Sequence, residues 1–182
     1  MPKHRIFGSI VLTFMTRAAS GYWRIIDPQN GYVAMGPRAL KELDFDSLAD
    51  GFMFENDLLI NLNILNLRVK DIPIPSVYGA EVSSMKLFKI IPTFTIFLTK
   101  GFFRRLFYKY IVRGFHPVAL FLLFGFLLFG WGFVFGILTW IHTLRSHVPA
   151  TTGTVMLSVL PFLTGFQLLL WAFVLDIQEE PK

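Results

Sequence analysis

Two long apolar runs without a charged residue constrain the fold of this chain more than any other feature. Residues 117–141 and 153–175 contain no Asp, Glu, Lys or Arg. A helix rises about 1.5 Å per residue, so each run is long enough to cross a hydrocarbon core about 30 Å thick. Two buried helices of a soluble protein are the alternative, but a chain of 182 residues leaves too little to enclose them. The sequence therefore predicts a transmembrane helical hairpin.

The basic residues are divided unevenly along the chain. Of the 17 Lys and Arg residues, 15 precede residue 117, whereas the loop 142–152 between the two runs contains only Arg145. Because cytoplasmic flanks of membrane helices are enriched in Lys and Arg, residues 1–116 are expected in the cytoplasm and the loop outside. The predicted localisation is therefore an integral, multi-pass membrane protein with both ends cytoplasmic.

A basic amphipathic segment, 93–113, lies just before the first run. On a helical wheel its apolar side chains gather on one side, and three cations lie opposite, namely Arg105, Lys109 and Arg113. This pattern is typical of a helix that lies in the headgroup plane and is attracted to anionic lipid. Packing of the same helix on a soluble core is the alternative. Because the cations cluster beside a membrane span, lipid and not nucleic acid is the expected partner, despite a pI of about 9.6.

The first 85 residues have a mixed pattern that predicts an α/β fragment. Apolar residues recur at helical spacing in 5–19 and 55–65, and a proline opens a short helical segment at 37–43. Aromatic and β-branched residues flank a DPQNG turn in 21–34, which predicts strand–turn–strand, and 68–73 is predicted as a short strand. The absence of cysteine excludes disulfides, thiolate metal sites and a cysteine nucleophile.

Two motifs carry the candidate chemistry. DPQNGY spans residues 27–32, and FENDLL, residues 54–59, places Glu55 and Asp57 at the start of a helix. Carboxylates there can be held beside a cleft by the helix N-terminus, and such a carboxylate can take a proton from an acceptor oxygen. The alternative is that both are first-turn acids that only stabilise the helix. The doublet Asp44 and Asp46 has the DxD spacing of a cation site, but it lies in a segment that is expected to face water.

The order of the motifs resembles one family. DPQNGY, FENDLL, the segment VKDIPIPSVYGAEVS at 69–83, a basic stretch and an apolar hairpin follow one another as in family 2 glycosyltransferases of the polyprenyl- or dolichyl-phosphate sugar synthase type. The resemblance implies the C-terminal part of a GT-A-like domain with a mixed sheet. It also implies transfer of a hexose from a nucleotide sugar to a polyprenyl phosphate at the membrane, with Mg²⁺ or Mn²⁺ in the full-length enzymes.

The resemblance also implies site residues. It makes Asp57 and Glu55 the catalytic candidates. The residues expected to bind the acceptor are Arg5, Ser9, Gln29 and Asn30, and those expected to reach the donor diphosphate are Lys86 and Lys89. The implied domains are an acceptor-side part (1–85), an interfacial segment (86–116), the hairpin (117–176) and a cytoplasmic tail (177–182).

The nucleotide-binding half of such enzymes has no counterpart in this sequence. The chain by itself is therefore expected to be inactive, to hold no metal ion, and to meet a nucleotide sugar only together with a donor-binding half. A non-enzymatic hairpin that tethers a partner at the membrane is the alternative function. Glycines in the first run, including Gly132 and Gly136, permit close helix packing, either within the hairpin or in a homo-oligomer.

Overall fold

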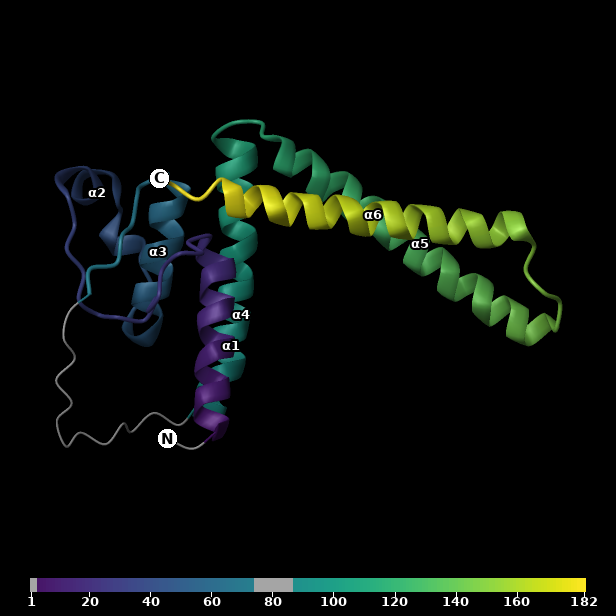
Figure 1. The fold of residues 1–182 in the computed structure, drawn as a ribbon, viewed down its shortest axis with the longest axis horizontal. Coiled ribbons are helices and arrows are strands. Elements are labelled where there is room, and N and C mark those ends of the chain that lie inside the picture. The colour runs from purple at the N-terminus through teal and green to yellow at the C-terminus, as the bar shows by residue number, and fades with distance from the viewer. Residues whose placement is uncertain (1–2, 74–86) are drawn as a thin grey trace. The chain divides into compact units, whose positions relative to one another are not determined.

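The computed structural model describes residues 3–73 and 87–182, and its regular elements are helical (Figure 1). The helices are α1 (Lys3–Ser20), α2 (Pro37–Glu42), α3 (Phe54–Ile64), α4 (Leu87–Phe107), α5 (Pro117–Ser146) and α6 (Thr152–Gln178). Short turns of 3₁₀ helix, η1 (Phe45–Ser47) and η2 (Gly51–Met53), precede α3, and a π-helical turn, η3 (Tyr108–Val112), follows α4. The chain forms two compact units, Met1–Lys109 with Glu180–Lys182, and Tyr110–Glu179.

The prediction of an α/β fold is wrong, because the described residues form no strand or sheet. The segments 21–34 and 68–73, both predicted as strands, run without regular backbone pairing. A strand is stable only when a neighbouring backbone satisfies its N–H and C=O groups. Here side chains take that part: the Asp71 carboxylate accepts a hydrogen bond from Ile26 N at 2.5 Å, and the Tyr22 hydroxyl donates to Leu67 O.

The first unit has two apolar clusters on either side of α3. One cluster joins α3 to the irregular segments, and its buried members are Tyr22, Ile25, Leu43, Leu48, Leu58, Leu59, Leu62 and Leu67. The other joins α3 to α1 and α4, with Ala19, Ile60, Phe94 and Leu98 buried. The helical spacing of Leu58, Leu59 and Leu62 explains why α3 forms and buries this face. The predicted helices 5–19, 37–43 and 55–65 are confirmed.

The face of α4 that the sequence assigned to lipid phosphates is partly internal. Arg105 is fully buried, and its guanidinium donates to Ala19 O at 2.9 Å and to Ala18 O at 3.2 Å. These carbonyls end α1, where helix carbonyls lack intrahelical partners and the dipole favours a cation. Gly21 follows with φ +74°, and a Cβ there would lie 2.7 Å from Arg105 Nη1. The expectation that Arg105 lies on an exposed basic face is therefore wrong.

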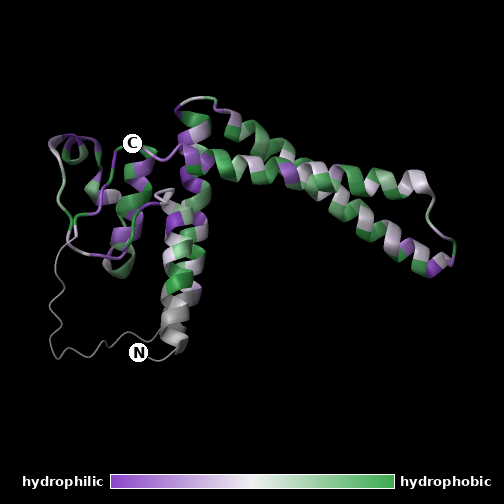
Figure 2. Ribbon diagram, viewed as in Figure 1, coloured by the Kyte–Doolittle hydropathy of each residue, from purple (hydrophilic) through white to green (hydrophobic). Residues whose placement is uncertain are grey.

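The second unit is a hairpin of two apolar helices, α5 and α6, which Figure 2 shows mostly in green and white. Both are long and apolar enough to cross a membrane, and only 22% and 11% of their most apolar windows are buried. A core helix of a soluble protein would be mostly buried, so these helices suggest a membrane-associated protein.

Glycines set the close approach of α5 and α6. A Cβ on Gly165 would lie 2.2 Å from Phe129 N, and one on Gly132 would lie 2.5 Å from Phe162 N. Ser158 Oγ donates across the hairpin to Gly132 O at 3.3 Å. Gly136 also faces this partner helix, since its Cβ would meet Ser158 Oγ at 2.6 Å. The sequence left open whether Gly132 and Gly136 permit close packing within the hairpin or in a homo-oligomer. In the structure both glycines pack within the hairpin.

Candidate functional site

Glu55 is the acidic residue of the FENDLL motif that remains free to meet a ligand. It lies in the first turn of α3, is half-buried, and forms no hydrogen bond or ion pair with the described residues. Its carboxylate lies beside the DPQNGY loop, because a Cβ built on Gly31 would be 3.7 Å from Glu55 Oε1. The structure therefore brings together the two motifs that the sequence analysis singled out.

The DPQNGY loop is ordered by its own side chains. Asp27 Oδ1 accepts a hydrogen bond from Gln29 N at 3.3 Å, and Asn30 Oδ1 accepts one from Tyr32 N at 3.0 Å. Such turns are characteristic of Asp and Asn, whose short side chains reach the backbone two residues on. Gln29 and Asn30 are exposed. The side-chain amide of Gln29 and the Asn30 Nδ2 group consequently stay available as hydrogen-bond donors next to the loop that contacts Glu55.

Asp57 has a different environment. Its side chain is 3% exposed and forms an ion pair with Arg104 of α4. Its Oδ2 accepts a hydrogen bond from Ala49 N at 2.9 Å, and Asn61 Nδ2 lies 3.3 Å from its Oδ1. The carboxylate thus links α3 to α4 and to the segment before η2. It has protein partners on both oxygens, whereas the Glu55 carboxylate has none among the described residues.

Sequence reasoning missed the partners of Asp57. Asn61 follows it by four residues, so helical spacing alone placed both on one face of α3 and would have identified this pair. Arg104 is 47 residues away, in the segment 93–113 that the sequence predicts as a helix in the headgroup plane. Only the packing of α4 on α3 brings the guanidinium to the carboxylate.

The remaining predicted site residues can be placed only in part. Arg5 and Ser9 lie in α1, but their side chains fall outside what the structure describes. Lys86 falls outside the described residues, and Lys89 lies in the first turn of α4 without a described side chain. The structure therefore does not test whether these four residues approach Glu55.

The described part of the chain offers no metal centre. No three His, Asp or Glu side chains converge there in a way that could hold a metal ion. Asp44 and Asp46, the DxD doublet, are exposed around η1. Residues 3–73 and 87–182 therefore offer no ligand set that fits the Mg²⁺ or Mn²⁺ that the family resemblance implies.

Comparison with known proteins adds no relative: no family model, no curated protein and no solved structure matches the chain.

Proposed function

We propose that this protein is the acceptor side of a membrane glycosyltransferase that transfers a sugar from a nucleotide sugar to a polyprenyl phosphate. One observation carries the proposal: the free carboxylate of Glu55 lies against the DPQNGY loop, which presents the amides of Gln29 and Asn30. A carboxylate next to amide donors can bind both a sugar hydroxyl and a phosphate oxygen. The nucleotide sugar is held by a donor-binding domain that acts together with this chain.

The reaction requires little proton transfer by the protein. An oxygen of the acceptor phosphate, already an anion at pH 7, attacks the anomeric carbon of the donor. The bond between that carbon and the diphosphate oxygen breaks, and the nucleoside diphosphate leaves with the electron pair. The protein's contribution is then to position the two substrates and to exclude water. Glu55 accepts a hydrogen bond from a sugar hydroxyl, and the loop amides donate to the acceptor phosphate.

In this account Asp57 is a positioning residue. Its oxygens are occupied by Ala49 N, Asn61 and Arg104, so it contacts other parts of the protein and not a substrate. It holds the start of α3, and with it Glu55 two residues earlier, against α4. A first-turn acid also benefits from the helix dipole, worth about 0.3–1 kcal/mol.

The hairpin supports a lipid acceptor. Helices α5 and α6 are long and apolar enough to span a bilayer, and a polyprenyl chain is soluble only there. The excess of Lys and Arg before residue 117 supports a multi-pass protein with residues 1–116 and the C-terminal tail on the cytoplasmic side. The phosphate of the lipid would then meet the first unit at the membrane surface.

Binding of a short polyprenyl phosphate, farnesyl phosphate, to the full chain in detergent tests the proposal. Asn30→Asp keeps the acceptor for Tyr32 N but replaces the amide donor with a charge that repels phosphate. Because a hydrogen bond to a charged group contributes about 1.5–3 kcal/mol, affinity should fall by about tenfold or more. Gln178→Ala, at an exposed amide in the last turn of α6, is the matched control and should bind like the wild type.

The result decides between an acceptor-binding enzyme subunit and a non-enzymatic membrane protein. If the wild-type chain does not bind farnesyl phosphate, or if Asn30→Asp binds it as well as the wild type, the acceptor role is wrong.

A non-enzymatic membrane tether is the second candidate. Large apolar side chains on α1 and α4 are exposed, including Ile10 at 62%, Phe14 at 57% and Phe103 at 52%. Such side chains are typical of a surface that docks another protein or the membrane. If the chain recruits a partner through them, Phe14→Ser should abolish recruitment and leave any binding of farnesyl phosphate unchanged.

A further inference from the structure

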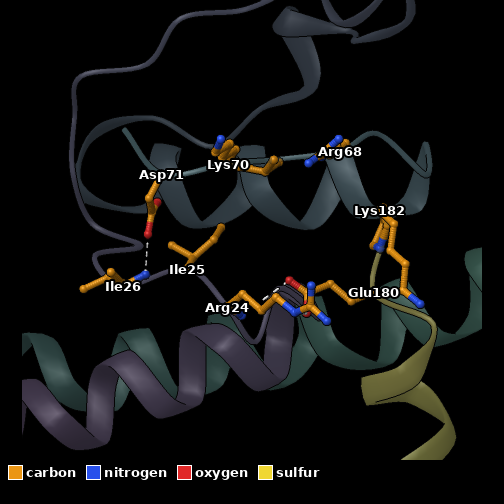
Figure 3. Close-up of a pocket in the computed structure, with 10 residues that line it drawn as sticks. Arg24, Ile25, Ile26, Arg68, Lys70, Asp71, Glu180 and Lys182 are labelled. Atoms are coloured by element: carbon orange, nitrogen blue, oxygen red, sulfur yellow. Dashed lines mark hydrogen bonds and ion pairs between the residues drawn. The ribbon is translucent and has the colours of Figure 1, made fainter. Parts of the chain in front are cut away.

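A pocket in the first unit, of about 430 Å³, shares no lining residue with the proposed acceptor site. Figure 3 shows its walls: residues 24–26 on one side, residues 68–71 on the other, and residues 180–182 beside them. Its volume is in the range of small-ligand sites. The charged side chains that line it are Arg24, Arg68, Lys70, Asp71, Glu180 and Lys182.

The charges of this pocket favour an anion. Four cations face two carboxylates, and both carboxylates already have partners. Asp71 Oδ2 accepts from Ile26 N at 2.5 Å, and Glu180 lies 3.7 Å from Arg24 Nε. Arg68 and Lys70 form no ion pair or hydrogen bond with the described residues, so their charges are available to a ligand.

The walls of the pocket are held in place before a ligand arrives. Arg17 Nε of α1 donates to Ile25 O at 2.8 Å, which fixes one wall. The buried Tyr22 hydroxyl donates to Leu67 O, immediately before Arg68, and fixes the other. Burial raises the pKa of Tyr22, so the hydroxyl keeps its proton and remains a donor at neutral pH. A preformed site loses less entropy on binding than one that a ligand must order.

We infer that this pocket binds the phosphate or diphosphate group of a small ligand through Arg68 and Lys70. The planar guanidinium of arginine donates two parallel hydrogen bonds to phosphate oxygens, and a lysine beside it adds a point charge. The apolar wall at Ile25 leaves room for the remainder of the ligand. The phosphate belongs either to a lipid headgroup or to a soluble molecule, and the site uses no residue of the proposed acceptor site.

Calorimetric titration of inorganic pyrophosphate into the full chain, in nanodiscs of phosphatidylcholine, tests the inference. The wild type should bind, and the double variant Arg68→Gln with Lys70→Gln should bind at least about tenfold more weakly, because charged hydrogen bonds are lost. The matched control is Arg38→Gln with Lys41→Gln on α2, which removes the same charges from exposed positions outside the pocket. The control should bind like the wild type.

Two further variants separate binding from folding. Arg68→Lys with Lys70→Arg keeps both charges and should retain binding within about threefold, whereas helix content by circular dichroism should match the wild type in every variant. If a double variant loses helix content, the single variants Arg68→Gln and Lys70→Gln replace it, and each should weaken binding. Absence of wild-type binding, or equal weakening in the pocket variant and the α2 control, would overturn the inference.

Short-chain phosphatidic acid, titrated in the same way, identifies the source of the phosphate. Binding at least about tenfold tighter than that of pyrophosphate assigns the pocket to a lipid headgroup, and weaker or equal binding assigns it to a soluble phosphate. Either result supports the inference only if the double variant at Arg68 and Lys70 binds the titrated ligand more weakly than the wild type. The result does not depend on farnesyl phosphate binding at the DPQNGY loop, so the two proposals can fail separately.

Discussion

Asp57 of α3 and Arg104 of α4 form an ion pair in which the carboxylate is 3% exposed and the arginine side chain 39% exposed. The pair joins two helices through residues that are 47 positions apart in sequence. Removing one member of such a pair leaves the other with a desolvation cost that its partner no longer offsets.

Arg104→Ala should therefore destabilise the first unit. Asp57 keeps its hydrogen bond from Ala49 N, so the expected cost is that of one weakened buried group, about 1–3 kcal/mol. Thermal unfolding of the full chain in detergent, followed by circular dichroism, measures it. Arg38→Ala is the control, since Arg38 and Glu42 form an exposed pair on α2 that contributes about 0.3–0.5 kcal/mol. Equal effects of the two substitutions would contradict a structural role for the Asp57–Arg104 pair.

Tyr22 should make the stability of the first unit sensitive to alkali. Burial raises its pKa, the Glu180 carboxylate raises it further, and Arg105 partly offsets this. The folded chain then holds the phenolic proton more tightly than the unfolded chain does. The stability that the protonated Tyr22 contributes is fully present below the unfolded-state pKa of about 10, and it is lost as the pH rises above that value.

Tyr22→Phe should change that dependence. At neutral pH the variant loses the hydrogen bond to Leu67 O and about 1 kcal/mol of stability. Between about pH 9 and pH 11 its unfolding temperature should fall less steeply than that of the wild type, because the buried ionisation is gone. Parallel slopes in the two proteins would show that other groups control the alkaline transition.

Gly165 should be indispensable to the hairpin. A Cβ there would lie 2.2 Å from Phe129 N and 2.9 Å from Gly125 O, both backbone atoms that a side-chain rotation cannot move. Gly165→Ala should cost about 1–3 kcal/mol of overpacking strain and lower the thermal unfolding temperature of the hairpin in detergent. Gly130→Ala, where a Cβ would meet nothing within 4 Å, is the control and should be tolerated. A tolerated Gly165→Ala would mean that α5 and α6 do not pack this closely.

Helices with their own apolar face could be predicted from the sequence, whereas structure that depends on distant partners could not. The 3.6-residue spacing in α3 and the uncharged lengths of α5 and α6 are local signals, and the structure confirms these helices. The pattern at 21–34 predicts strands, but aromatic and β-branched residues also suit an irregular segment that buries Tyr22 and Ile25 against α3. The residue types favour a strand only where another strand is available to pair with it, which the local sequence does not reveal.

The candidate site shows the same division. The motif positions identified Glu55 and the DPQNGY loop, and the structure places them next to each other. The partners of Asp57 and the burial of Arg105 depend on how α4 packs on α1 and α3. A helical wheel shows which residues share a face, but not whether that face meets lipid, water or the carbonyls of another helix.

The topology proposed for the hairpin rests on the charge division and can be measured directly. Protease sites inserted at residue 1 and at residue 182 should both be protected in sealed cells, and a site inserted near Ser146 should be cut from outside. The reason is that 15 of the 17 Lys and Arg precede the first span. Cleavage of the N-terminal site in intact cells would show the opposite orientation.

Sugar transfer by the full chain together with a donor-binding domain tests the central claim most directly. The measured quantity is the rate of polyprenyl-phosphate-dependent transfer from a nucleotide sugar, for the wild type, Glu55→Gln and the surface control Glu42→Gln. Loss of one preorganised group at the reacting centre typically costs about a hundredfold in rate, so Glu55→Gln should fall by that factor with its helix content unchanged. Glu42→Gln should keep the wild-type rate. A Glu55→Gln variant that transfers sugar as fast as the wild type would contradict the account.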